Sequence, residues 1–133
     1  MVDSSERRQF SKSTKIKTMT QFRIMDALTL QRERQRAINR RKNIFSLRGE
    51  RINVNTGCVS KVMLAKALYP KQTGKTLNST GTWLTTGRVR IQMISNGMMQ
   101  IICDILGVDA NFLIGLESIH DKDFNRLVNI DNK

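Results

Sequence analysis

Residues 98–115 read MMQIICDILGVDANFLIG, and this stretch predicts two short amphipathic helices in succession. Ser95 is placed to cap the first helix and Gly107 to end it, since serine favours helix starts and glycine favours helix ends. Asp109 then caps a second helix over Ala110–Ile114. Apolar side chains recur at helical spacing and give each helix one core-facing side: Met98, Ile101, Ile102, Ile105, Leu106, Phe112 and Leu113.

Two more helices are expected upstream of this stretch. Ser60 is a good cap for a helix over Lys61–Leu68, which has an apolar stripe and is stopped by Pro70. After a polar loop over 71–75, a short helix is capped by Asn78 or Ser79 and runs to about Thr85. Its core anchors are Trp83 and Leu84, and Gly87 ends it.

The remaining segments complete an expected bundle of about five helices. Residues 1–19 show no helical or strand period and indicate a flexible basic arm, whereas residues 20–43 indicate a basic helix. The helical pattern continues to Ile52 and breaks at the turn-forming residues 53–57. Residues 88–94 alternate as in a short extended stretch, and residues 117–133 form a C-terminal extension with one more amphipathic turn or two at Phe124, Leu127 and Val128.

The charge distribution favours a polyanionic partner. The 133-residue chain carries 23 Lys and Arg against 11 Asp and Glu, a formal net charge of +12. Residues 1–51 hold 14 basic and 5 acidic side chains, and residues 52–108 hold 6 and 1, so most of the chain is basic. Residues 109–133, with 3 basic and 5 acidic side chains, are mildly acidic. Such a surface attracts nucleic acid.

Several classes of protein are disfavoured. The chain is too short for two cores of ordinary size, and no apolar run reaches the length of a membrane helix. Two cysteines and the single His120 make neither a disulfide framework nor a zinc cluster. Gly74-Lys75-Thr76 lacks the first glycine of a phosphate-binding loop. We therefore expect no enzyme, no metal, no cofactor and no small-molecule substrate, in a cytoplasmic protein associated with the nucleoid.

The motif at 98–115 resembles the last two helices of the lambda-repressor-like helix-turn-helix family, in which an apolar helix ends in Leu-Gly-Val before a capped short helix. Residues 60–68 resemble the second helix of that family, and residues 78–87 resemble its recognition helix, although the loop between them is longer here. The resemblance spans about residues 44–116. It implies a DNA-binding domain over that range and, since members often act as dimers, leaves a homodimer open.

We accordingly expect sequence-specific binding of double-stranded DNA by residues 78–86, and with it transcriptional regulation. Short polar side chains can reach base edges in the major groove, and flanking cations can hold phosphates. The expected DNA-binding residues are Lys71, Gln72, Lys75, Asn78, Ser79, Thr80, Thr82, Thr85, Arg88 and Arg90. Nonspecific contacts with nucleic acid are expected from the basic helix, through Arg32, Arg34, Arg36, Arg40, Arg41 and Lys42.

Two other functions stay open on the sequence. A nucleoid- or virion-associated packaging protein could use the basic segment for nonspecific nucleic acid and the helical domain for protein contacts. RNA binding is the third option, although the chain lacks the aromatic platform on which RNA bases usually stack.

Overall fold

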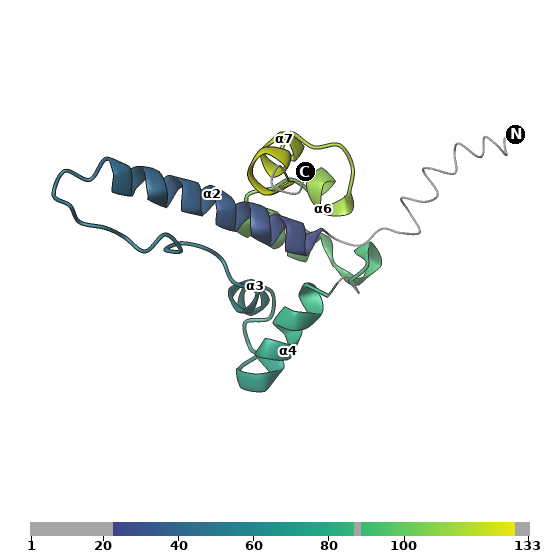
Figure 1. The fold of residues 1–133 in the computed structure, drawn as a ribbon. Coiled ribbons are helices and arrows are strands. Elements are labelled where there is room, and N and C mark those ends of the chain that lie inside the picture. Colours follow the sequence, from purple (N-terminus) through teal and green to yellow (C-terminus); the bar gives the residue numbers. More distant parts are fainter. Residues whose placement is uncertain (1–22, 87–88, 130–133) are drawn as a thin grey trace, which may run out of the picture.

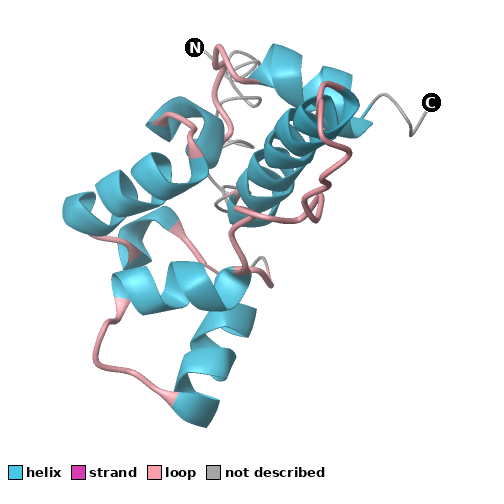
Figure 2. Cartoon of the chain, turned by 90° about the vertical axis from the view of Figure 1, so that its left-hand side faces the viewer, coloured by secondary structure: helices cyan, strands magenta, loops and turns pink. Residues whose placement is uncertain are grey.

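A computed structural model describes residues 23–86 and 89–129, and the regular structure in these ranges is all helical (Figure 2). The helices in chain order are α2 (Ile24–Ile44), α3 (Lys61–Leu68), α4 (Gly74–Leu84), α5 (Asn96–Leu106), α6 (Ala110–Ile114) and α7 (Asp121–Phe124). A 3₁₀ turn (Ile91–Met93) precedes α5, and a π-helical turn, η2 (Asn125–Asn129), continues α7. The predicted all-α class is confirmed for these residues. The predicted arm over 1–19, with Gly87 and Arg88, lies outside them.

Three predicted helix starts are confirmed by their capping hydrogen bonds. Ser60 Oγ accepts the Met63 backbone N–H at 3.1 Å, and Ser95 Oγ accepts a backbone N–H in the same way at the start of α5. Asp109 Oδ1 caps α6 through the Phe112 N–H at 2.9 Å. These bonds satisfy N–H groups that have no partner inside the helix, so a local sequence signal decided each boundary.

Among the described residues, one hydrophobic core joins the first half of α2 to α3, α5 and α6. Its fully buried side chains include Leu28 from α2, Leu64 from α3, Ile102 from α5 and Phe112 from α6. Helix α2 packs against α5, α6 and η2, while α3 packs against α4 and α5. The predicted C-terminal turn is present, and Phe124 at the end of α7 is buried in the same core.

The helices are arranged on two sides of α2. Figure 1 shows α6 and α7 on one side of α2, and α3 and α4 on the other. Helix α4 points away from the rest of the molecule, and α3 is the helix against which it packs most extensively. The second half of α2 projects beyond the other helices, and the loop over residues 45–60 returns along it.

The prediction that the helix continues to Ile52 is wrong. Helix α2 ends at Ile44. The chain then turns back, and two asparagine side chains of α2 bind the backbone of the returning loop. Asn43 pairs with the backbone of Ile52 through both its amide nitrogen and its amide oxygen. Asn39, which is only 1% exposed, donates to the carbonyl oxygens of Val54 and Thr56 at 2.7 and 2.8 Å. Backbone groups of the loop over residues 52–56 therefore bond to these asparagine side chains instead of continuing the helix.

Two predictions around α4 also need correction. The helix begins at Gly74 rather than at Asn78 or Ser79, and Thr73 precedes it without a side-chain capping bond. Gly74 has a φ of +58°, a left-handed conformation that glycine adopts readily and that lets the chain turn into the helix. The expected extended stretch near residue 91 is a 3₁₀ turn, closed by the Met93 N–H donating to the Arg90 carbonyl oxygen.

Candidate nucleic-acid interface

One side of α4 is apolar and packs on the molecule. Leu77, Gly81 and Leu84 follow one another at spacings of four and three residues, so they share one side of the helix. Gly81 and Leu84 are buried, and Leu77 is partly buried against the core. Trp83, predicted as a core anchor, is partly buried against the core. The helix is therefore held from behind, as the sequence pattern indicated.

The opposite side of α4 is polar and exposed. We call this surface the outer face of α4, and it consists of Lys75, Asn78, Ser79 and Thr82. Asn78, Ser79 and Thr82 lie three, four and seven positions after Lys75, so the four side chains project from one side of the helix. Three of them carry short amide or hydroxyl groups that can both donate and accept hydrogen bonds. The outer face thus offers polar atoms close to the helix backbone.

The N-terminus of α3 lies directly beside the outer face. A Cβ atom added at Gly81 would lie 3.2 Å from the Lys61 carbonyl oxygen, so the two helices approach closely because residue 81 is glycine. The Lys61 Nζ donates to Thr82 Oγ1 at 3.3 Å. Sequence reasoning missed Lys61 because its nearness to Thr82 arises from the packing of two helices, and no local pattern encodes it.

Two residues predicted to contact DNA, Thr80 at the bases and Gln72 at the phosphates, bind each other instead of sharing the outer face. Thr80 is half-buried, and its hydroxyl donates to Gln72 Oε1 at 2.6 Å. The Gln72 carbonyl oxygen accepts a bond from Lys66 Nζ at 3.0 Å. Together these bonds fasten the loop over residues 69–73 to α3 and α4. Lys71 in the same loop is exposed.

The C-terminal end of α4 is less open than its outer face. The Thr85 hydroxyl lies within hydrogen-bond distance of the Gly81 and Thr82 carbonyl oxygens, at 3.2 and 3.1 Å, and so bonds to its own helix. Arg90 is half-buried. Among the described residues predicted to contact DNA, the structure therefore brings Lys75, Asn78, Ser79 and Thr82 together, whereas the Thr85 hydroxyl is bonded to its own helix and Arg90 is half-buried.

The region around α3 and α4 carries a uniformly positive charge. Residues 51–103 contain no Asp or Glu. Their basic side chains are Arg51, Lys61, Lys66, Lys71, Lys75, Arg88 and Arg90. The described cations beside the outer face, Lys61 and Lys75, therefore have no acidic neighbour within this stretch and give the surface a positive potential.

The predicted nonspecific contacts on α2 fall into two groups. Arg34 is a structural residue: its guanidinium donates to the Gly107 carbonyl oxygen at 2.8 Å and pairs with Asp123 at 3.0 Å. Arg36 pairs with Glu33 and donates to Asn55 Oδ1 in the returning loop, and Arg32 is half-buried. The exposed cations are at the outer end of the helix: Arg40, Arg41 and Lys42.

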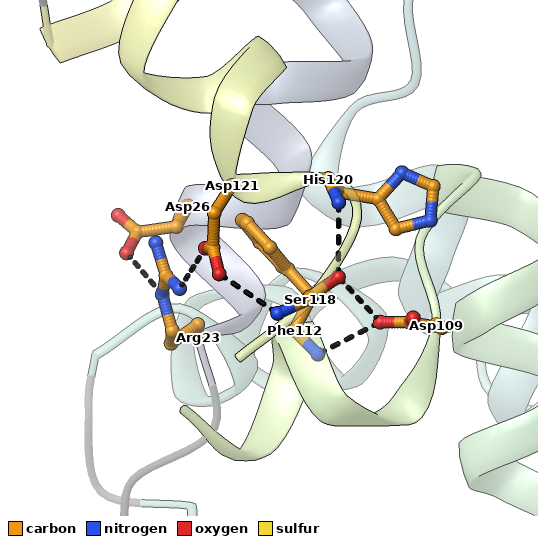
Figure 3. A network of polar contacts seen from close by, with 7 residues as sticks. All are labelled: Arg23, Asp26, Asp109, Phe112, Ser118, His120 and Asp121. Carbon is orange, nitrogen blue, oxygen red and sulfur yellow. Dashed lines mark hydrogen bonds and ion pairs between the residues drawn. The ribbon is translucent and has the colours of Figure 1, made fainter. Parts of the chain in front are cut away.

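A polar cluster at the other side of α2 is also structural (Figure 3). The Ser118 hydroxyl donates to Asp109 Oδ1 at 2.7 Å and accepts the backbone N–H of His120, whereas the His120 ring lies 3.0 Å from an Arg34 nitrogen. A catalytic pair of serine nucleophile and histidine base would need a hydrogen bond between the Ser118 hydroxyl and the His120 ring. The residues instead join the C-terminal segment to the start of α6.

Arg23, the residue directly before α2, anchors the same segment. Its guanidinium pairs with Asp26 and Asp121 at 3.0 and 3.2 Å, and it stacks 4.0 Å above the centre of the Phe112 ring (Figure 3). Such a cation over an aromatic face stabilises the contact. Arg23 thus fixes the first turn of α2 onto α6 and α7.

Two carboxylates of this region have lowered pKa values. Burial raises the pKa of Asp109, but hydrogen bonds from the Ser118 hydroxyl and the Phe112 N–H outweigh burial and leave the pKa below its ordinary value of 3.8. For Asp123, the hydrogen bond from Arg126 lowers the pKa most, and Arg34 lowers it further against the effect of burial. Both groups are therefore stabilised as anions.

The structure gives no sign of a metal or redox centre within residues 23–86 and 89–129. No group of three or more His, Cys, Asp or Glu side chains in these ranges could hold a metal ion. Cys58 and Cys103 are free thiols, and burial, followed by the nearby Asp109 and Asp104 carboxylates, raises the pKa of Cys103. None of the described helices has the length and apolar content that crossing a membrane requires.

The outer face of α4, bordered by lysines and free of carboxylates, is thus the best candidate for a binding surface in the described structure. Compared with family models, with curated proteins and with solved structures, this chain matches none.

Proposed function

We propose that this protein binds double-stranded DNA by inserting the outer face of α4 into the major groove, and that it regulates transcription through the sequence it reads. The observation that carries the proposal is the two-sided character of α4. Its apolar side is held by the molecule while its exposed side presents short polar groups between lysines. A major groove admits one α-helix, whose side chains then reach the base edges.

Asn78 and Ser79 are the residues best suited to read bases. The Asn78 amide offers a donor and an acceptor, the pair of groups that adenine matches in the major groove. The Ser79 hydroxyl can bond to any of several base edges, and the Thr82 methyl suits the methyl group of thymine. Each of these side chains is short, so the α4 backbone can approach the bases closely.

We assign phosphate contacts around α4 to three lysines. Lys75 lies in the first turn of the helix, Lys71 in the preceding loop, and Lys61 beside Thr82 at the start of α3. If each neutralises one phosphate, affinity should fall roughly fortyfold between about 50 and 200 mM salt. Replacing any one lysine by alanine should weaken binding to all duplexes alike, since phosphate contacts carry no sequence information.

The order of helices supports the same proposal. Helices α3 and α4 are the pair that resembles the helix-turn-helix unit, and α5 and α6 follow as the two helices whose sequence carries the resemblance. In that arrangement the second helix of the pair enters the groove. Helix α4 is the one that points away from the molecule, as this role requires.

The proposal is tested by selecting preferred duplexes from a random pool and measuring binding by fluorescence anisotropy. Asn78→Ala should lower the ratio of specific to nonspecific affinity by about 5- to 150-fold, because one base contact of this kind contributes roughly 1–3 kcal/mol. Thr76→Ala is the matched control, since Thr76 is an exposed residue of α4 that lies off the outer face. An unchanged ratio in Asn78→Ala would reject the outer face as the reading surface.

A packaging function is the second candidate, favoured by the exposed cations at the outer end of α2. Such a protein needs only phosphate contacts and would show no preference among duplexes. If selection yields no enriched sequence and binding remains strongly dependent on salt, the packaging function replaces the regulatory one.

A further inference from the structure

The projecting half of α2 carries a second exposed surface, which we call the α2 groove. It is an open depression lined by Ala37, Ile38, Arg41, Lys42 and Phe45. Arg41 and Lys42 lie three and four positions after Ile38, and Phe45 lies seven positions after it, so these residues form one stripe along the helix. Ile38 is 47% exposed and Phe45 is 71% exposed, although both are large apolar side chains. The surface therefore combines apolar atoms with two cations.

Hydrogen bonds hold the part of α2 that carries the α2 groove against the returning loop. The returning loop is fastened to the other faces of this half of α2 by Asn39, which binds the Val54 and Thr56 carbonyl oxygens, and by Asn43, which binds Ile52. Asn39 also accepts a bond from Gln35 at 3.2 Å. The loop thus covers part of α2 and leaves the stripe from Ala37 to Phe45 uncovered.

The charge of the α2 groove restricts what can cover it. Residues 37–45 include Arg40, Arg41 and Lys42 and no acidic residue. Two copies of α2 packed through this stripe would place cations opposite cations, which is destabilising. A nucleic-acid backbone could neutralise Arg41 and Lys42, but its phosphates would leave Ile38 and Phe45 without apolar contacts. Neither occupant matches both features.

We propose that the α2 groove docks an acidic amphipathic segment of a partner protein, whose apolar side covers Ile38 and Phe45 while its carboxylates pair with Arg41 and Lys42. Burial of the apolar side chains would supply affinity, and the ion pairs would select acidic segments over basic ones. The groove is made by α2 and by Phe45, the residue that directly follows it, so this proposal stands independently of DNA binding by α4.

The test uses the full chain and labelled peptides of about 18 residues, a length that forms a helix of several turns. The first peptide has leucines at helical spacing and glutamates elsewhere. The second has lysine in place of every glutamate, and the third has serine in place of every leucine. In fluorescence anisotropy the first peptide should bind at least about tenfold more tightly than either of the others.

Variants of the protein then locate the site. Phe45→Ser should weaken binding of the acidic amphipathic peptide at least about tenfold, and Arg41→Glu should do the same. Arg40→Glu is the matched control, because Arg40 is exposed on the same helix, does not line the groove, and changes the net charge equally. This control should bind within about threefold of the unmodified protein. Circular dichroism confirms that each variant remains helical.

Three outcomes would overturn the proposal. Equal binding of the acidic peptides with leucine and with serine would mean general attraction between charges. Loss of duplex affinity in Phe45→Ser, with peptide binding unchanged, would assign the groove to nucleic acid. A dimer in sedimentation velocity that dissociates on the Phe45→Ser substitution would show that a second copy of the chain covers it.

Discussion

Arg34→Ala should destabilise the fold by about 2 kcal/mol, although Arg34 belongs to a helix rich in exposed cations. The charged hydrogen bond to the Gly107 carbonyl oxygen, at 2.8 Å, contributes about 1 kcal/mol. The ion pair with Asp123 contributes about half as much, since the two side chains are 26% and 39% exposed and solvent screens them. The contact with the His120 ring, at 3.0 Å, adds a similar amount.

This loss is measured by thermal unfolding followed by circular dichroism. For a chain of this size 1 kcal/mol corresponds to about 4 °C, so Arg34→Ala should lower the Tm by about 8 °C. Arg40→Ala is the control, because Arg40 is exposed on the same helix, and its Tm should stay within about 2 °C of the unmodified protein. Equal melting of the two variants would refute the view that Arg34 joins α2 to α5 and α7.

Four further substitutions and conditions follow from the structure. Asn39→Ala should lower the free energy of unfolding, measured by urea denaturation, by about 1–3 kcal/mol, because the variant lacks the buried amide that binds the returning loop. A loss below about 0.5 kcal/mol would show that water takes over the bonds of this amide. The Asp109 and Asp123 carboxylates have lowered pKa values in the folded state. Their contribution to folding stability is therefore present above about pH 4 and is lost as the pH falls through those lowered values. Asp109→Asn, which retains a capping side chain, should flatten this acid dependence of the Tm, and an unaltered profile would contradict the assignment. Gly81→Val should separate α3 from α4 and weaken duplex binding more than Thr76→Val, since its Cβ meets the Lys61 backbone. Lys61→Ala should reduce the slope of log affinity against log salt by about 0.9, and an unchanged slope would remove Lys61 from the phosphate contacts.

The sequence predicted those parts of the fold that depend on neighbouring residues. Ser60, Ser95 and Asp109 were identified as caps because each precedes an apolar stripe at helical spacing. Gly107 was predicted to end α5 because glycine favours helix ends, and its φ of 70° confirms the expected left-handed conformation.

The features that were missed depend on distant residues. Helix α2 stops at Ile44 because Asn39 and Asn43 bind loop residues that lie 17 and 9 positions further along the chain, and nothing within the helix signals this. Arg34 resembled a free surface cation, yet its partners lie 73 and 89 positions away. The early start of α4 was obscured because Gly74 is a poor interior helix residue and its polar neighbours are typical of a loop.

The candidate site shows the same division. The helical spacing of Lys75, Asn78, Ser79 and Thr82 could be recognised in the sequence, but the true start of α4 was needed to show that these four residues share one face. Thr80 has the same side-chain chemistry as Thr82, and only the packing against Gln72 separates their roles.

The most direct test of DNA binding by α4 is an NMR titration of the ¹⁵N-labelled protein with a duplex selected from a random pool. Backbone amide shifts should change most over residues 74–84 and at Lys61, and should change little in α6 and α7, which lie on the other side of α2. Shifts confined to the outer end of α2, with α4 unaffected, would contradict the account.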